Sequence, residues 1–502
     1  MTLARALTTS SVLALLAGPA LADLTAEEVL ADQLNQMSIY GLNAQALSER
    51  RSGNVLTVDG LTATAEIPGE DVSIAMTMGG AIYTEQGDGS VLVTYPDEIP
   101  LNVLVTGIEG EDDVTIDMTI RQAGTQSLVT GSPEQFRYEY TSQTATVSDF
   151  VISGPEEAAN LKLDVSVDFV NFQSVMNIAS GDIRPYDLEM SLGLINMLIS
   201  GSEVDSDEEM NLSFDVSDLV AKYAGTLSEQ SLMDSFATTI EKGNTMAGTL
   251  SHGTASYVFD VETPDGQVEG SANMASADYD FSMDENGLDY GGVTKSTTIT
   301  VGGSAIPLPP MTFQMAEYGG RFKLPVVPGE DPQDFAMALS LVDVVVDPFL
   351  WSMFDPTEQL PRDPATVVVD MSGELVMLQD VFDPEFAETM GQNGPPGQIN
   401  ALDVNQIKVS LAGAELTGDG ALTFNNDTGL PVPAGIVNIA LKGGNTLLDT
   451  LVGMGLLPEE QAMGARMMSG LFARPGTGPD TLVSTIEMNE DGSILANGQR
   501  IK

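Results

Sequence analysis

The sequence predicts a mainly β protein of the α+β class. It is expected to form a long antiparallel meander, curled or in two parts, with a few short helices at the N-terminus, in the middle and at the C-terminus. After Gly53, short segments rich in β-branched residues place an apolar residue at every second position, and turns containing Gly, Asp or Pro separate them. Hydrophobic residues make up 42% of the chain, which is enough to bury one face of such a sheet.

The first 22 residues are typical of a secretory signal peptide. Arg5 precedes an apolar stretch that runs to Leu16, and Ala20 and Ala22 are the small residues expected at the −3 and −1 positions. We therefore expect cleavage after Ala22 and a periplasmic location, with an extracellular location less favoured. The alternative is an N-terminal core helix. No later run reaches the roughly 20 apolar residues of a membrane-spanning helix, so an integral membrane protein is not expected.

The exported chain is expected to divide into two halves. Residues 23–243 would hold an N-terminal helix and the first part of the meander. Residues 244–502 would hold a second β-rich half that closes with a helical pair and two strands. Thr25 and Glu28 form a capping box for a helix over about Ala26–Tyr40, which we expect to plug one end of the sheet.

The remaining elements follow from local spacing and from Asp-Pro pairs, which suit helix starts because Asp caps well and Pro at the first position loses no hydrogen bond. The segments expected to be helical are Leu219–Lys242, Pro332–Ala338, Pro348–Phe354, Pro384–Met390, Asn445–Gly455 and Pro458–Phe472. The clearest expected strands are Val72–Met78, Ser90–Tyr95, Leu101–Thr106, Val114–Ile120, Phe136–Ile152, Leu161–Phe172, Asp187–Leu194, Met210–Val216, Thr254–Glu262, Gln267–Met283, Thr297–Val301, Phe313–Leu324, Thr366–Asp370, Gln406–Leu411, Ala421–Phe424, Ile436–Leu441, Thr481–Met488 and Ser493–Ala496.

Composition excludes several classes of chemistry. The chain has 73 acidic and 19 basic residues, and its formal charge of −54 repels nucleic acid. It has no Cys, so it has no disulfide, thiolate metal site or cysteine nucleophile. Its one histidine, His252, stands in a turn-like stretch without a nucleophile elbow around it. We therefore expect no catalytic residue, no cofactor and no enzymatic activity, with a carboxylate-pair glycan hydrolase as one alternative.

Calcium is the metal that the sequence best accommodates. Asp205, Asp207 and Glu209 place carboxylates at alternate positions, as a hard cation requires. An EF-type loop would need Gly at its sixth place and Glu at its twelfth, where Met210 and Val216 stand. A solvated loop is therefore the favoured interpretation, and a calcium-stabilised structural or adhesive envelope protein is the other alternative function.

Methionine is unusually frequent, with 25 Met against 17 Phe. Met is flexible and polarizable, so it suits surfaces that accept variable apolar shapes, although ordinary core filling is the more common role. If the meander curls without closing, its inner face would be an apolar groove for a lipid-like ligand. The sequence thus predicts a non-enzymatic envelope binding or scaffold protein. Candidate groove residues near the C-terminus are Met454, Met463, Met467 and Met468.

Several stretches of the second half carry a family resemblance. They are Leu350–Pro356, Leu360–Ala365, Val367–Gly373, Gly413–Ala421, Gly429–Pro431 and Asp491–Gln499. In these stretches the chain resembles an uncharacterised alphaproteobacterial family, the domain of unknown function DUF2125. The resemblance implies an exported, β-rich, non-catalytic protein, and it brings no functional residues with it.

Overall fold

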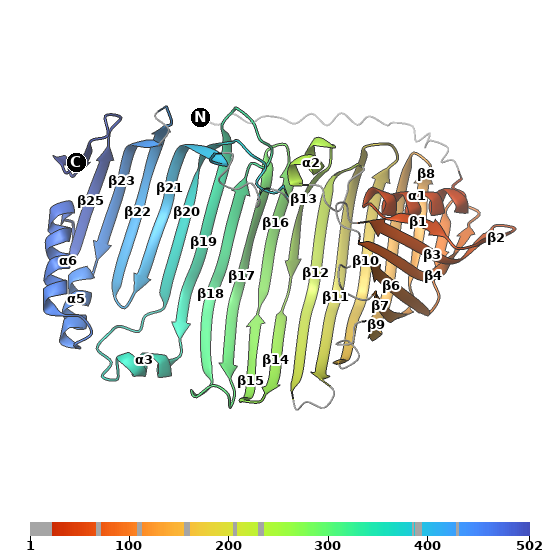
Figure 1. Cartoon of the computed structure of the whole chain (residues 1–502), viewed down its shortest axis with the longest axis horizontal. Coiled ribbons are helices and arrows are strands. Elements are labelled where there is room, and N and C mark those ends of the chain that lie inside the picture. The colour runs from red at the N-terminus through yellow and green to blue at the C-terminus, as the bar shows by residue number, and fades with distance from the viewer. Residues whose placement is uncertain are drawn as a thin grey trace, which may run out of the picture.

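One antiparallel sheet extends along the whole molecule (Figure 1). The computed structural model describes residues 23–502, apart from 67–71, 108–112, 155–160, 204–207, 229–234, 384–385, 387–393 and 428–430. Each strand is hydrogen-bonded to strands that are close to it in sequence, so the chain advances along the sheet as it is read from N- to C-terminus. The expected mainly β meander with a few short helices is confirmed.

Five helices lie in the described part of the chain. They are α1 (Ala26–Ile39), α2 (Phe236–Glu241), α3 (Pro348–Phe354), α5 (Gly444–Gly453) and α6 (Glu459–Phe472). The capping box of α1 is present, because the Thr25 hydroxyl accepts from the Glu28 N–H at 3.3 Å while the Glu28 carboxylate accepts from the Thr25 N–H at 2.8 Å. The expected first helix, the short helix at Pro348 and the C-terminal pair are confirmed. Most of the helix expected at Pro384–Met390 lies outside the described residues.

The longest strands of the first half are its last four, β9 to β12. They are β1 (Asn43–Ala46), β2 (Glu49–Ser52), β3 (Val55–Glu66), β4 (Ser73–Glu85), β5 (Val91–Thr94), β6 (Glu98–Thr106), β7 (Val114–Ala123), β8 (Gln126–Ser132), β9 (Gln135–Ser153), β10 (Leu161–Ala179), β11 (Arg184–Glu203) and β12 (Glu209–Leu227). Beside β4, the short strands β5 and β6 lie end to end in one row. β8 and β7 fill the next row, which pairs with β9.

The same arrangement recurs after β12. The strands are β13 (Thr245–His252), β14 (Ala255–Thr263), β15 (Gly266–Met274), β16 (Ser276–Asp284), β17 (Gly287–Gly302), β18 (Met311–Leu324), β19 (Gln333–Val346), β20 (Ala365–Met377), β21 (Gly397–Leu411), β22 (Ala414–Asn425), β23 (Val432–Lys442), β24 (Arg474–Pro475), β25 (Thr481–Met488), β26 (Ile494–Ala496) and β27 (Gln499–Arg500). β13 and β14 share the row beside β12, and β16 and β15 share the row beside β17. The topology of β4–β9 is therefore repeated in β12–β17, and the sheet continues without a break across the expected division at residues 243 and 244.

Two expected helices are wrong. Residues 219–227 continue strand β12, and among the described residues of the expected Leu219–Lys242 segment, which exclude 229–234, Phe236–Glu241 is the helical part. The strand places Leu219 and Tyr223 on one face, but the residues between them on that face are small, so the two-residue period is hidden in the sequence. The second segment, Pro332–Ala338, lies in β19, where Pro332 directly precedes the strand and costs no ladder hydrogen bond.

A line of residues in the left-handed region crosses the sheet and divides it into two wings. Asn171 of β10 (φ 57°) and Asp218 of β12 (φ 52°) both stand opposite Gly193 of β11 by register, and Ser296 and Asp343 continue the line through β17 and β19. We call this line the crease. The upper wing lies on the side of α2 and the lower wing on the side of α3 (Figure 1).

The crease changes the phase of side-chain alternation within a strand. In β10, Phe169 precedes Asn171 by two residues and Phe172 follows it by one, yet both line the same cavity together with Met176. The left-handed residue thus keeps apolar side chains on one face of both wings. We call the face covered by α1 the inner face, because α1 packs its apolar residues against it in a hydrophobic core cluster.

Candidate functional site

An unbroken apolar row runs along the inner face of the upper wing. Its members, each opposite the next in register, are Tyr138, Met176, Leu188, Tyr223, Gly248, Phe281, Tyr290, Phe322, Met337, Met371, Val404, Gly420, Val437 and Ile486. None of them carries a charge. Thirteen steps between strands at about 4.8 Å each make the row ~60 Å long.

The neighbouring row on the outer face has the opposite character. Its members are Glu139, Val175, Glu189, Lys222, Thr249, Asp280, Gly291, Arg321, Ala338, Asp370 and Gln406. Six of these eleven residues are charged, and Arg321 donates to Asp289 on the same face at 2.6 Å. The acidic character of the chain therefore gathers on the outer face and leaves the inner face apolar.

The lower wing repeats the apolar pattern. Phe214, Tyr257, Ala272, Ile299, Phe313 and Val346 form one register row across β12, β14, β15, β17, β18 and β19. Both wings thus present an uncharged surface to the same side of the sheet.

Much of this apolar surface is accessible. Tyr290, Phe322, Met337 and Leu339 are 41–48% exposed, although they lie on the inner face. The accessible surface of the chain is 28667 Å², whereas a compact monomer of this mass exposes about 18,000 Å². Exposed contiguous apolar patches larger than a few hundred Å² mark binding surfaces. We call the inner face from β10 to β25 the groove.

The N-terminal end of the groove is covered by α1, which encloses a chamber against both wings. A cavity of about 670 Å³ is lined by Met37 of α1, Tyr140 of the upper wing and Phe169 of the lower wing, among others. A second cavity of about 510 Å³ shares Tyr140 and Phe169 with it and continues toward Leu188. No charged side chain lines either cavity. The chamber therefore continues the uncharged surface of the groove under the helix.

The polar groups of the chamber pair with one another. The Tyr83 hydroxyl donates to Gln33 Oε1 at 2.7 Å. Burial raises the pKa of Tyr95 to about 12, with a smaller contribution from Tyr140 nearby, so the phenol stays neutral. The chamber thus has no ionised group with which to hold a charged ligand.

A buried ion pair fixes α1 to the sheet. Arg184 at the start of β11 pairs with Asp32 of α1, and the two side chains are 1% and 5% exposed. Tyr138 donates to Asp32 Oδ2 at 2.6 Å, and Arg184 Nε donates to the Ala179 carbonyl at 2.8 Å. Burial and then the Asp32 charge raise the pKa of Tyr138. This network holds the helix over the chamber.

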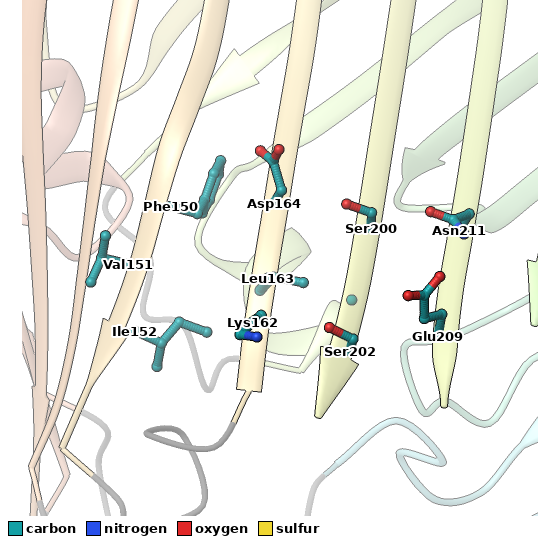
Figure 2. Close-up of a pocket in the computed structure, with 11 residues that line it drawn as sticks. Phe150, Val151, Ile152, Lys162, Leu163, Asp164, Ser200, Ser202, Glu209 and Asn211 are labelled. Atoms are coloured by element: carbon teal, nitrogen blue, oxygen red, sulfur yellow. The ribbon is translucent and has the colours of Figure 1, made fainter. Parts of the chain in front are cut away.

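A second opening lies in the lower wing between β9 and β10, and we call it the slot. Figure 2 shows its two banks, with Phe150–Ile152 on β9 and Lys162–Asp164 on β10. Ser200 and Ser202 of β11 and Glu209 and Asn211 of β12 complete a cavity of about 530 Å³. Unlike the chamber, the slot has a polar and partly charged lining.

The predicted site residues fall in different places. Met463, Met467 and Met468 lie on α6 at the C-terminal end of the sheet and are 56–68% exposed, and Met454 directly follows α5. None of these four lines the chamber, so the structure does not bring them together with it.

Glu209, the calcium candidate within the described residues, begins strand β12 at the slot. Asp205 and Asp207 lie outside the described residues, as does the expected cleavage site at Ala22, whereas Glu209 lines the slot. No group of three His, Cys, Asp or Glu side chains suited to a metal gathers within the described ranges.

His252 ends strand β13 near the crease. Its Nδ1 lies 2.8 Å from the Gly253 carbonyl oxygen, and its ring stands 6.2 Å from that of Tyr279. These contacts give the imidazole a structural setting on the inner face.

Residue-by-residue reasoning missed the chamber and the Asp32–Arg184 pair, because both depend on contacts between distant segments. One signal for the groove is present in the sequence. Within strands such as β10, β14 and β16, acids occur at the positions that alternate with the apolar ones.

Comparison with known proteins identifies a family for the second half. Residues 254–496 match a family described as an uncharacterized protein conserved in bacteria, DUF2125. No curated protein matches the chain. Across the described part of the chain, no helix has the length and apolar character needed to cross a membrane. The match spans β14 to β26 and contains the stretches that carried the resemblance, except that the last of them, Asp491–Gln499, extends beyond its end at residue 496. Residues 254–496 are a DUF2125 region.

Proposed function

We propose that the protein is an exported, non-enzymatic binding protein of the bacterial envelope that holds the apolar chains of lipid-like ligands along the groove. The observation that carries the proposal is the uncharged row from Tyr138 to Ile486, which is ~60 Å long and includes the 41–48% exposed side chains of Tyr290, Phe322 and Met337. Export to the periplasm is proposed from the signal-like pattern of the first 22 residues.

The groove suits a chain-shaped ligand for energetic reasons. Covering ~400 Å² of its exposed apolar surface would contribute about 10 kcal/mol at ~25 cal/mol per Å², from which the cost of association must be subtracted. The uncharged row offers no ionised partner and few directional hydrogen bonds, so recognition would depend on apolar contact. Met337 and Met371 stand side by side in this row, and flexible thioethers adapt to chains of different shape.

The chamber suits the end of such a chain. Its lining is uncharged, so placing an ionised headgroup there would cost the full desolvation of that charge. A hydrocarbon end carries no such cost. The headgroup would remain outside α1, where the open groove lets it reach water.

A face-specific pair of variants tests the proposal. Met337→Asp puts a charge on the groove, and Val345→Asp puts the same charge on the outer face of the same strand, where Val345 is 42% exposed. Binding of a naphthylamine dye and native mass spectrometry of protein from the periplasm are the measurements. We expect bound lipid and strong dye fluorescence in the parent and in Val345→Asp, and a marked loss of both in Met337→Asp. A parent protein free of lipid and dye, or equal losses in both variants, would refute the proposal.

A further inference from the structure

We propose that the slot between β9 and β10 receives an extended segment of a partner protein, which pairs with the free strand edges and carries basic side chains toward the outer face. This inference is independent of what the groove binds. It would add a strand to the sheet at an internal position of the meander.

The slot exists because two neighbouring strands stop pairing. Across the described residues, the ladder between β9 and β10 ends at Val147 and Val167 in the lower wing. Beyond that point, the pairings among described residues join β9 to β7, up to Ser153, and β10 to β11, from Leu161 onward. Each bank is therefore an edge strand.

The separation is built into β9. Asp149 lies in the left-handed region with φ 59° at the point where the ladder ends, and β7 shifts register by one residue opposite it. Arg121 of β7 donates to the Asp149 carboxylate at 2.5 Å and to the Ser148 hydroxyl at 2.7 Å. These bonds stabilise a bulge, and bulges turn a strand away from its neighbour.

The free edges specify the chemistry of the occupant. Within a strand, every second residue directs its N–H and C=O to a given neighbour, so a six-residue edge such as 161–166 offers about three such donor–acceptor pairs to the slot. Another peptide backbone satisfies a row of this kind, whereas a lipid chain offers no donors or acceptors.

The side chains at the slot select the charge of the occupant. Asp164 and Glu209 line it together with a single cation, Lys162, and the chain as a whole carries a formal charge of −54. Lysine or arginine on the outer side of an added strand would meet these carboxylates. On the other side of that strand, apolar residues would continue the surface formed by Phe150 and Leu163.

Hydrogen exchange on the full-length mature chain tests the inference. The probe is a nine-residue peptide of alternating Val and Lys with blocked ends, and its control has the same sequence with N-methylated backbone amides, which cannot pair as a strand. We expect saturable protection of amides in residues 148–153 and 161–166 with the first peptide and none with the control.

A matched pair of variants tests the charge selection. Asp164→Lys should weaken binding of the peptide about two- to fivefold, the range expected for exposed ion pairs. Asp403→Lys changes an exposed carboxylate on the outer face of β21, away from the slot, and should leave binding unchanged. The inference is overturned if the N-methylated peptide protects equally, if protection falls on β2 or β27 instead, if no protection appears at millimolar peptide, or if the two variants behave alike.

Discussion

Replacing Arg184 by Met should release α1 from the sheet. The guanidinium of Arg184 is 1% exposed, and its partner Asp32 would be left as a buried charge without its cation. Breaking a buried ion pair in this way costs about 3–5 kcal/mol of unfolding free energy. The Tyr138 and Gln36 side chains that also donate to Asp32 would remain, so the lower part of this range is expected.

The double variant Asp32→Leu/Arg184→Met distinguishes the net contribution of the ion pair to stability from the cost of leaving one buried charge without its partner. Because two apolar side chains would fill the site without an orphaned charge, most of the lost stability should return. A single variant that costs less than about 1 kcal/mol, or a double variant less stable than Arg184→Met, would refute this account of α1.

This prediction is best tested by measuring the stability of α1 itself, because a long sheet need not unfold in one step. Amides of α1 should exchange more than about a hundredfold faster in Arg184→Met, because exchange follows the free energy of local opening. The only tryptophan, Trp351, lies in α3 at the other half of the sheet. Its fluorescence transition in urea is the internal control and should not move.

Two further predictions concern the second half and the crease. Burial opposes ionisation of Asp480, but hydrogen bonds from Thr446 and Asn445 at the start of α5 outweigh it and hold the pKa of this carboxyl below its usual 3.8. The stability contributed by the ionised carboxylate is therefore present above about pH 4 and is lost as the pH falls through the lowered pKa. Asp480→Asn should lower Tm at pH 7, and its difference from the parent should vanish in acid, once the parent carboxyl is protonated. Asn171→Val places a β-branched residue in the left-handed region and should cost about 1–2 kcal/mol in urea denaturation, whereas Asn171→Gly should be tolerated. Equal stabilities of the two Asn171 variants would contradict the strain assigned to the crease.

The sequence allowed the strands and the terminal helices to be predicted because their signals are local. The capping box at Thr25 and the Asp-Pro step before Pro348 act within one turn of helix. The two-residue alternation is equally local, and it predicted an apolar inner face before any register was known.

The wrong helix prediction arose where the spacing of large apolar residues along the sequence differs from the two-residue alternation of the strand that forms. In β12, the inner-face residues after Asp218 include Ala221 and Gly225, whose small size left only Leu219, Tyr223 and Leu227 visible at four-residue spacing. That spacing is typical of a helix, and the ladder with β11 and β13 overrode it. The crease could not be predicted for a related reason. A single Asn or Asp in a strand does not reveal a change in side-chain alternation until the neighbouring strands are aligned in register.

The chamber required contacts across long stretches of chain. Asp32 and Arg184 are 152 residues apart in sequence, and nothing near either residue predicts its partner. The same holds for the slot, because the bulge at Asp149 and the end of the β9–β10 ladder become visible only when the strands are aligned.

A protein built on one sheet, in which each row of strands pairs only with the rows beside it, should respond to mechanical force in a distinctive way. Tension applied between the termini is transmitted through every ladder of the sheet, and the outermost strands, each paired along one side only, should detach first. Extension should therefore proceed as a series of small releases of one or two strands each, starting from the ends, instead of one large rupture. The α1 anchor would make the strands at the N-terminal end more resistant to detachment. The release of strands should therefore begin at the C-terminal end of the sheet.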